Sequence, residues 1–299
     1  MTNVGRRARR FLYLVVLTAC GIDARGQLLP DQSASSLDGG GAESGTTDGS
    51  EGDGSIDAGA DDANDASDDV ATDSPVTNPR GRVTNGLIAL YELEENGGTV
   101  AKDTSGVAPA LDLTIPVTVT WIPKAIKFDV ASHVTSGSGA TKIVNRCKAA
   151  NAVTIEAWIR YGSLPAFSRI VALSQNADIG NAAMTSDSLT IGFDMRSTTN
   201  MYQRTTLNVF DGGTPTTLVH LVDTRGPGGV KRVYLNGALV IDDTQGGDLS
   251  TWDGTYPLSV GNTPALDRAF YGEVHLVAFY DRALSAAEVM TNRNAGADP

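Results

Sequence analysis

Short runs of alternating apolar and polar residues, separated by glycine, proline, asparagine and aspartate, dominate the chain between residues 86 and 281. Such runs are typical of β-strands, because successive side chains of a strand point to opposite faces of a sheet. Six of them are clear: 86–93 (GLIALYEL), 154–160 (TIEAWIR), 169–174 (RIVALS), 189–195 (LTIGFDM), 230–240 (VKRVYLNGALV) and 273–281 (EVHLVAFYD). Their spacing is that of a sandwich and not of βαβ units, so the pattern predicts an all-β fold.

Two local signals place a turn and a helix in this region. Asn236-Gly237 separates RVYL from ALVI, and this pair supplies the two positive φ angles of a type I′ turn, which predicts a β-hairpin. Near the C-terminus, Ser285 and Glu288 stand three residues apart, as in a capping box. One short helix is therefore predicted after the last strand.

The N-terminus has the composition of an export signal. Four arginines within residues 6–10 precede the apolar stretch FLYLVVLTA, which is too short to span a bilayer. The sequence LTAC at residues 17–20 resembles the lipobox of bacterial lipoproteins, in which the cysteine is acylated and becomes the first residue after cleavage. We therefore predict a signal peptide over residues 1–20 and a lipid on Cys20. The alternative is an ordinary signal peptide with an incidental cysteine.

A lipid on Cys20 has consequences for the second cysteine and for location. Cys147 is the only other cysteine, and it cannot pair with an acylated Cys20, so we expect it to be a buried, small apolar residue. Gly21 follows the lipidation site, and the absence of an aspartate there favours sorting to the outer membrane. Whether the protein faces the periplasm or the cell surface stays open.

Residues 21–79 differ from the rest of the chain in composition and charge. They are rich in Gly, Ser, Ala and Asp, and they carry 14 acidic residues against one arginine. A segment with so few large apolar side chains cannot offset the entropy of folding, which predicts a disordered acidic tether. Residues 80–299 carry a net charge of only −3, so the folded part has no basic surface of the kind that binds nucleic acid.

The remaining 220 residues, 80–299, are predicted to form one domain. The segments TIEAWIR, VKRVYLNGALV and AFYGEVHLVAFYDRALSAAEV, together with the opening GLIALYELEENGGTVAKDTSG, resemble laminin G-like domains of the concanavalin A-like lectin and glucanase superfamily. The resemblance implies a jelly roll of two antiparallel sheets, with ligands held at the concave face or the loop rim. One departure is TTLVHLVDT, which keeps His220 but lacks the tryptophan that relatives often carry there.

The sequence favours binding over catalysis. Glucanases of this superfamily place several carboxylates on one strand, whereas TIEAWIR supplies only Glu156, and retaining hydrolysis needs two carboxyl groups about 5 Å apart. We expect no enzyme activity, and Glu156 is kept as a weak ligand-binding candidate. The alternative is an unrecognised glycoside hydrolase that pairs Glu156 with Asp194 or Glu273 from an adjacent strand.

Calcium is the one metal that the sequence leaves open as a cofactor. Relatives often bind it through oxygens of rim loops, and Asp103 and Asp267 are the weak candidates here, with Asp248 and Asp253 in a similar loop. Aspartate is also an ordinary turn residue, so these positions equally suit turns without metal. The three histidines show no spacing that suits a zinc site.

Aromatic rings are the remaining candidates for a sugar-binding surface. Trp252 lies in a Gly- and Asp-rich loop, which favours exposure, whereas Trp158 lies in the middle of a predicted strand and suits the core better. The sequence thus predicts a lipid-anchored, non-catalytic module at the cell envelope. Its partners would be the membrane, through the lipid, and a glycan or an envelope protein. A structural adhesion role is the other alternative.

Overall fold

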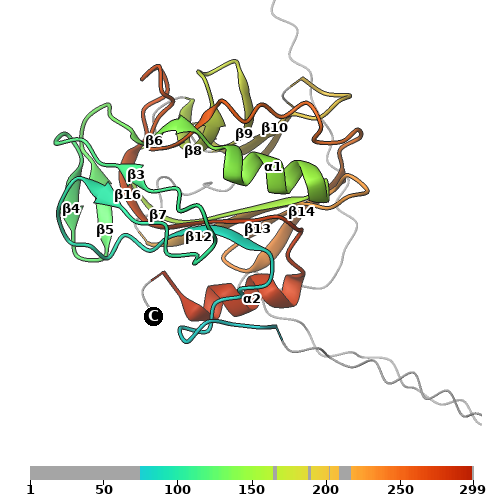
Figure 1. Cartoon of the computed structure of the whole chain (residues 1–299), viewed down its shortest axis with the longest axis horizontal. Helices are drawn as coiled ribbons and strands as arrows, with labels where there is room; N and C mark the ends of the chain where they lie inside the picture. The colour runs from blue at the N-terminus through green and yellow to red at the C-terminus, as the bar shows by residue number, and fades with distance from the viewer. Residues whose placement is uncertain (1–74, 164–166, 188–189, 202, 209–216, 298–299) are drawn as a thin grey trace, which may run out of the picture. The chain divides into compact units, whose positions relative to one another are not determined.

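The computed structural model describes residues 75–163, 167–187, 190–201, 203–208 and 217–297. All of these residues belong to the unit Asp69–Pro299. Among the described residues, sixteen strands form two antiparallel sheets, which two helices accompany. The two sheets pack face to face (Figure 1). This confirms the all-β jelly-roll sandwich. Cys20, the predicted signal peptide and the predicted tether as far as residue 74 lie outside the described residues.

The first sheet contains eight strands around the long central strands β7 and β16. Their order is β14 (Ala238–Thr244), β13 (Val230–Leu235), β12 (Val219–Arg225), β7 (Val153–Ser163), β16 (Tyr271–Tyr280), β5 (Ala125–Phe128) and β4 (Thr120–Ile122). The eighth strand, β1 (Leu87–Tyr91), pairs with the C-terminal half of β16, beyond the residues that pair with β5. The first and last long strands of the domain are therefore neighbours.

The second sheet also contains eight strands. Their order is β11 (Gln203–Asn208), β10 (Thr190–Met195), β9 (Gly180–Asp187), β8 (Ser168–Ser174), β15 (Pro257–Val260), β6 (Val134–Gly139), β3 (Leu113–Thr114) and β2 (Val100–Ala101). All six runs expected from the sequence lie in strands of the two sheets. At the predicted hairpin, Asn236 and Gly237 have φ angles of 50° and 81° and connect β13 to β14, which confirms the turn.

The main core fills the space between the sheets, and a helix absent from the sequence-based expectation closes one end of it. This helix, α1 (Thr141–Ala150), contributes Ile143, Val144 and Cys147, all fully buried. Only these three positions carry its apolar face, so the helical period was too short to recognise in the sequence. Cys147 is a free thiol in this core, and burial raises its pKa far above the usual value. This agrees with the expected role as a small apolar residue.

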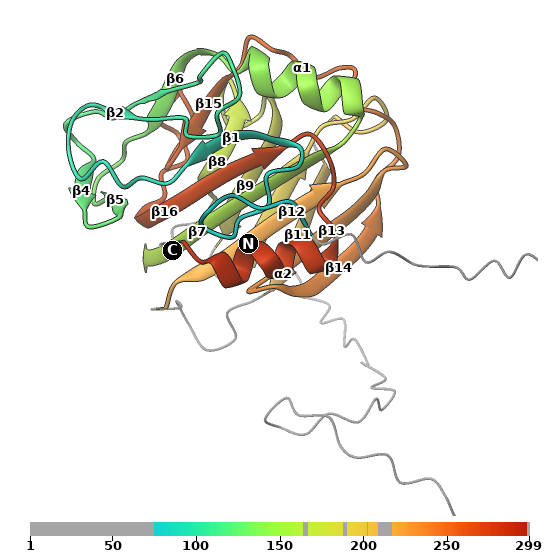
Figure 2. The same cartoon turned by 60° about the horizontal axis from the view of Figure 1, so that its bottom comes forward.

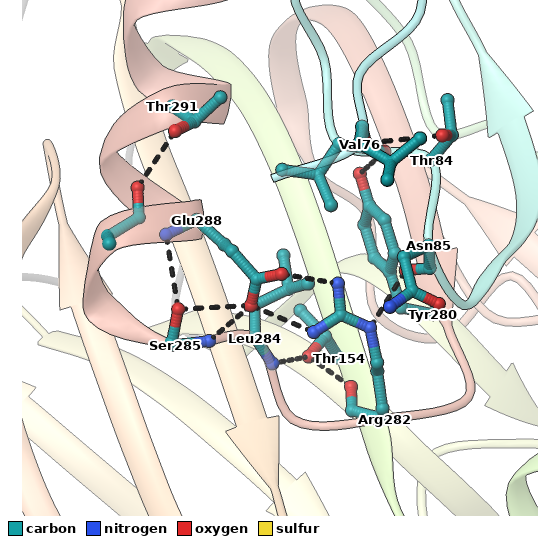
Figure 3. Close-up of polar contacts among 12 residues, drawn as sticks. Val76, Thr84, Asn85, Thr154, Tyr280, Arg282, Leu284, Ser285, Glu288 and Thr291 are labelled. Carbon is teal, nitrogen blue, oxygen red and sulfur yellow. Dashed lines mark hydrogen bonds and ion pairs between the residues drawn. The ribbon is translucent and has the colours of Figure 1, made fainter. Parts of the chain in front are cut away.

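The second helix, α2 (Ala286–Ala295), lies against the outer face of the first sheet, the face turned away from the second sheet (Figure 2). Its N-terminus is the predicted capping box: Glu288 N donates to Ser285 Oγ at 3.3 Å, and Ser285 N donates to a Glu288 carboxylate oxygen at 2.9 Å. Arg282 adds two hydrogen bonds to the same carboxylate (Figure 3). The helix therefore begins at a point fixed to the end of β16.

The N-terminal part of the described chain is joined to α2 and the C-terminus. Thr77 forms an isolated bridge with Val83, so residues before the expected boundary at 80 take part in the fold. Val83 N donates to Asn292 Oδ1 at 2.9 Å, and the buried Arg82 donates to the carbonyl oxygen of Gly296 at 2.6 Å. The two ends of the folded domain thus lie side by side.

Polar side chains also connect the two sheets inside the sandwich. Lys231 of β13 donates to the carbonyl oxygen of Phe193 in β10 at 3.0 Å, and Gln245 donates to that of Met195 at 2.9 Å. Asp223, fully buried beside Lys231, has its pKa raised to about 6 by burial, although the lysine opposes that rise. These contacts fix the sheets against each other at the end that carries β10 and β13.

No helix within the described residues is long and apolar enough to cross a membrane.

Candidate functional site

The outer face of the second sheet is divided into a filled half and an open half. In the filled half, Asp194 of β10 receives hydrogen bonds from Arg169 at 2.5 Å and from Arg204 at 2.7 and 3.0 Å. Asp194 and Arg169 are almost fully buried, whereas the side chain of Arg204 is 32% exposed. This cluster occupies the surface over β8 to β11.

The connection between β8 and β9 closes this half further. Arg169 lies near the start of β8, five residues before Ser174, a separation of about 16 Å along a strand. Its guanidinium nevertheless donates to the carbonyl oxygen of Ala177 at 2.7 Å. Residues 175–179 must therefore fold back over the outer face of the sheet, which leaves little room there for a ligand.

The open half lies over β3, β6 and β15, where a pocket of about 360 Å³ is present. This volume lies within the range of roughly 300 to 1,000 Å³ that is usual for small-ligand sites. Side chains from two strands and three loops line the pocket, among them Thr114, Thr118, Ser132, His133, Thr135 and Leu266. The site therefore depends on the pairing of Thr114 in β3 with Thr135 in β6, which brings distant segments together.

Hydroxyl groups give the pocket its chemistry. Thr118 and Ser132 are hydrogen-bonded to each other through their hydroxyls at 2.7 Å. The Thr135 hydroxyl donates to the carbonyl oxygen of Leu258 at 3.1 Å and accepts from Gly137 N at 3.2 Å, which fixes its orientation. No acidic or permanently cationic residue is among the described residues that line the pocket.

His133 is the one titratable group of the pocket. Its Nδ1 is buried and has no hydrogen-bond partner among the described residues. Burial lowers the pKa of His133, so the imidazole is neutral at pH 7. With Nδ1 enclosed, the neutral imidazole can meet a ligand hydroxyl through Nε2, which donates or accepts according to the tautomer.

Exposed aliphatic side chains lie at or next to the pocket. Leu266, which lines it, is 50% exposed. Val117, between the lining residues Pro116 and Thr118, is 98% exposed, and Val130, next to Ala131, is 49% exposed. The pocket thus combines a mostly apolar surface with a few hydroxyl groups and one imidazole, a combination that suits the C–H faces and hydroxyls of a sugar ring.

Trp252 is not part of this surface, and the prediction that its ring is exposed is wrong. The side chain is only 2% exposed, belongs to the main core, and donates from Nε1 to the carbonyl oxygen of Arg196 at 2.8 Å. Its loop is held to α1, because Leu249 N donates to Asn151 Oδ1 and Lys148 donates to the carbonyl oxygen of Trp252. These bonds draw the loop over the end of the sandwich and turn the indole inward.

Glu156 is also enclosed, and it does not face a ligand cavity. It is fully buried beneath α2, where it accepts hydrogen bonds from Arg82 at 2.5 Å and Asn292 at 2.7 Å and forms a third with His220 at 3.0 Å. Burial opposes ionisation, but the charge of Arg82 and the hydrogen bonds lower the pKa of Glu156 to about 2. Its observed role is therefore to join α2 and the N-terminal segment to the first sheet.

The carboxylate pairs considered for hydrolysis are not assembled. Asp194 lies on the outer face of the second sheet and Glu156 on the outer face of the first, so the core separates them. Glu273 pairs in register with Arg160, four residues along β7 from Glu156, a separation of about 13 Å. Neither separation fits the roughly 5 to 9.5 Å that glycosidase carboxylates require.

Trp158 lies on the outer face of the first sheet, far from the pocket. Its ring stacks on that of His220, with centroids 4.5 Å apart and planes inclined by 24°. It is partly exposed and packs against the small apolar cluster beneath α2. Trp158 thus supports the attachment of α2 and does not join the other candidate residues.

The four aspartates considered for calcium are dispersed. Asp103 is buried and paired with Lys142, Asp248 and Asp253 each accept from backbone amides two residues on, and exposed Asp267 accepts from Thr263 at 2.5 Å. Hydrogen bonds from Lys142 and Ser105 hold the pKa of Asp103 below its usual value, although burial raises it. No cluster of three or more metal-ligating side chains occurs in the described part of the chain. Only Asp267, next to Leu266, lies near the pocket.

Sequence reasoning did not identify the pocket residues. Threonine and serine are common in strands and turns, and none of these positions forms a recognisable motif. The only signal was the stretch HVTSGSG at 133–139, which carries both His133 and Thr135 and forms β6. These residues form one site because β6 pairs with β3. Their spacing along the chain does not reveal this pairing.

Comparison with known proteins agrees with the fold. The family model described as the concanavalin A-like lectin/glucanases superfamily matches residues 135–290. Among solved structures, the binding domain of botulinum neurotoxin DC in complex with rat synaptotagmin II has a TM-score of 0.53 at 15% identity, over 71% of this chain and 52% of that chain. The same toxin domain in complex with SialylT has a TM-score of 0.52 at 14% identity, with the same coverage.

A third similar structure is the Trypanosoma rangeli sialidase in complex with sialic acid, with a TM-score of 0.52 at 15% identity. The match covers 70% of this chain but 32% of the sialidase, so the chain corresponds to about a third to a half of these structures. At such identities the likeness concerns the fold alone. No curated protein matched the sequence. The family model spans more than half of the chain and the two sheets have the expected arrangement, so the chain belongs to the concanavalin A-like lectin/glucanases superfamily.

Proposed function

We propose that this domain is a non-catalytic binding module that holds a neutral carbohydrate in the pocket over β3, β6 and β15. The observation that carries the proposal is the lining of that pocket, which consists of a mostly apolar surface that also carries hydroxyl groups and a neutral histidine. Sugars present hydroxyls that donate and accept together with C–H faces that pack on apolar groups. Charged ligands have no counter-charge among the described lining residues.

The proposal includes attachment to the cell envelope. The lipobox-like LTAC supports a lipid on Cys20, and residues 21–74 would serve as an acidic tether between the membrane and the module, whose fold already includes Thr77. A flexible chain of that length reaches on the order of 45 Å, which would hold the pocket clear of the lipid surface. Sorting to the outer membrane follows from Gly21, and the near-neutral folded domain argues against nucleic acid as a partner.

A protein partner at the cell envelope is the second possibility. Val117, Val130 and Leu266 expose apolar surface at or beside one pocket, and such surface commonly marks protein interfaces. The toxin domain with a similar fold was solved with both a protein and SialylT, so this fold accommodates either kind of partner. The carbohydrate is preferred here because hydroxyl groups and an imidazole stand within the mostly apolar pocket, where they can bond to ligand hydroxyls.

The experiment is a binding survey with the full chain carrying Cys20→Ser, which keeps it free of lipid. Binding to a broad panel of neutral and acidic polysaccharides and to peptidoglycan is measured, and each glycan is checked for cleavage products. The proposal expects binding to at least one neutral polysaccharide, with no new reducing ends. Cleavage of any glycan would contradict the non-catalytic role, and binding to none would shift the proposal to a protein partner.

A further inference from the structure

A buried ammonium group lies beneath the loop that follows β2. Lys142, in the first turn of α1, has a side chain only 4% exposed, and its partner Asp103 is fully buried. The ammonium donates to Asp103 Oδ2 at 2.6 Å and to the carbonyl oxygen of Val107, with Ser105 Oγ at 3.4 Å. A carboxylate, a backbone carbonyl and a hydroxyl therefore surround one positive charge.

The loop holds these oxygens in place through bonds that do not involve the lysine. Asp103 Oδ1 accepts from Leu90 N at 3.2 Å and from Ser105 N at 3.1 Å, while Oδ2 also accepts from Leu111 N at 3.0 Å. The Ser105 hydroxyl donates to the carbonyl oxygen of Ile88 at 3.0 Å. The oxygen positions are thus fixed by β1 and by the loop itself.

Two of these oxygens, the carboxylate and the backbone carbonyl, are of the types that calcium prefers in proteins, together with water. A cavity of about 240 Å³ borders the cage and is lined by Asp103, Gly106, Val107, Ala108 and Ala110. It gives solvent access on one side, from which water ligands or an ion can arrive. An ammonium with three N–H donors matches three oxygens without needing the six to eight ligands of calcium.

We infer that residues 103–107 form a cation site of the hard, oxygen-ligated type, in which Lys142 supplies the cation from within the chain. The domain therefore keeps this loop folded without calcium, and removal of the ammonium converts the cage into a calcium site. The inference goes beyond the binding function proposed above and does not depend on it, because its readout is the stability of the domain.

The test compares thermal unfolding of three forms of the full chain, each with Cys20→Ser, in excess EDTA and in millimolar Ca²⁺. The first form has no further change, the second carries Lys142→Met, and the third carries Lys102→Met as the matched control. Lys102 is an exposed lysine that pairs with Asp112 near the same loop. The inference expects equal unfolding temperatures in both solutions for the first and third forms.

For Lys142→Met it expects a lower unfolding temperature in EDTA and a rise with increasing Ca²⁺. Calorimetry should give one added calcium site per chain, with a Kd on the order of 10⁻⁴ to 10⁻³ M, as in other extracellular modules. Adding Asp103→Asn to Lys142→Met should remove both the rise and the binding.

Two results would overturn the inference. One is a Lys142→Met form that folds but shows no added calcium site and no stabilisation by Ca²⁺. The other is that Ca²⁺ stabilises the form with the native Lys142 and that Asp103→Asn abolishes this stabilisation. This result needs no lysine variant, so it stays decisive if Lys142→Met fails to fold.

Discussion

Glu156 shows how one residue predicted to contact a ligand instead fixes the fold. Its carboxylate lies at the meeting point of β7, β12, α2 and the N-terminal segment, with Arg82, His220 and Asn292 as partners. Because Arg82 is itself only 2% exposed, a loss of the carboxylate charge leaves a buried cation without a counter-ion. The contribution of Glu156 is therefore to stability.

We predict that Glu156→Gln lowers the free energy of unfolding by about 3 to 5 kcal/mol, the usual cost of breaking a buried ion pair. Glu94→Gln, which removes an exposed pair with Arg80, should cost no more than about 1 kcal/mol. Urea unfolding of both variants measures the two values. Equal small losses would show that the Glu156 network does not hold α2 to the sheet.

Two buried carboxyl groups should give the stability opposite dependences on pH. The pKa of Glu156 is lowered to about 2, so its stabilisation is complete above the unfolded pKa of about 4.3 and is lost as the pH falls toward 2. Burial raises the pKa of Asp223 to about 6, so the folded state favours the protonated carboxyl group. The resulting contribution to stability is complete below the unfolded pKa of about 3.9 and is lost as the pH rises through 6.

We predict that Asp223→Asn removes a decline in stability between about pH 4 and pH 6. Unfolding free energies of the variant and of the unchanged protein, measured across that range, provide the check. A decline of the same size in both proteins would mean that Asp223 does not titrate with a raised pKa.

At the scale of the elements, the start of α2 depends on a small set of bonds around Ser285. The capping box and Arg282 hold the first turn of the helix (Figure 3). The hydroxyl of Thr154 in β7 accepts a hydrogen bond from Leu284 N and donates one to the carbonyl oxygen of Arg282. We predict that Ser285→Ala lowers the free energy of unfolding by about 1 kcal/mol, the usual value of an N-cap hydroxyl. Thr291→Ala, on the exposed side of the same helix, should be close to neutral.

Chemical denaturation of these two variants measures the difference directly. Faster amide exchange in the first turn of α2, seen only in Ser285→Ala, would support the local origin of the loss. A larger loss for Thr291→Ala than for Ser285→Ala would contradict the assignment of the cap.

Elements with strong local chemistry were the ones that the sequence predicted. The Asn236-Gly237 turn, the Ser285 cap and the long strands β7 and β16 each carry their signal within a dozen residues. Helix α1 and the strands β2 to β6, β9, β11 and β15 were not predicted, because these segments either are only a few residues long or show no clear period. Their formation depends on partners that are distant in the sequence.

At the scale of the whole molecule, the sequence predicted the family and the sandwich but not the pocket. Trp252 was expected to be exposed because its loop is rich in Gly and Asp, yet hydrogen bonds to α1 turn the ring into the core. The pocket, in contrast, brings together residues from 114 to 266 through the pairing of β3, β6 and β15. Local composition is a weak predictor of side-chain exposure and of pairing between distant strands. Exposure and strand pairing together decide where a ligand can bind.

The proposed function requires that the ligand binds in the pocket over β3, β6 and β15. The most direct measurement compares the affinities of three forms for the polysaccharide that the binding survey selects: the unchanged protein, Thr114→Ala combined with His133→Ala, and Thr206→Ala. Thr206 is an exposed threonine on β11, at the opposite edge of the second sheet. Loss of two hydrogen-bonding groups should weaken binding by about tenfold or more, since each contributes roughly 0.5 to 1.5 kcal/mol.

We expect this loss for the pocket variant and an unchanged affinity for Thr206→Ala, with all three forms equally stable to heat. Equal affinities for all three forms would contradict the claim and place the ligand elsewhere on the domain.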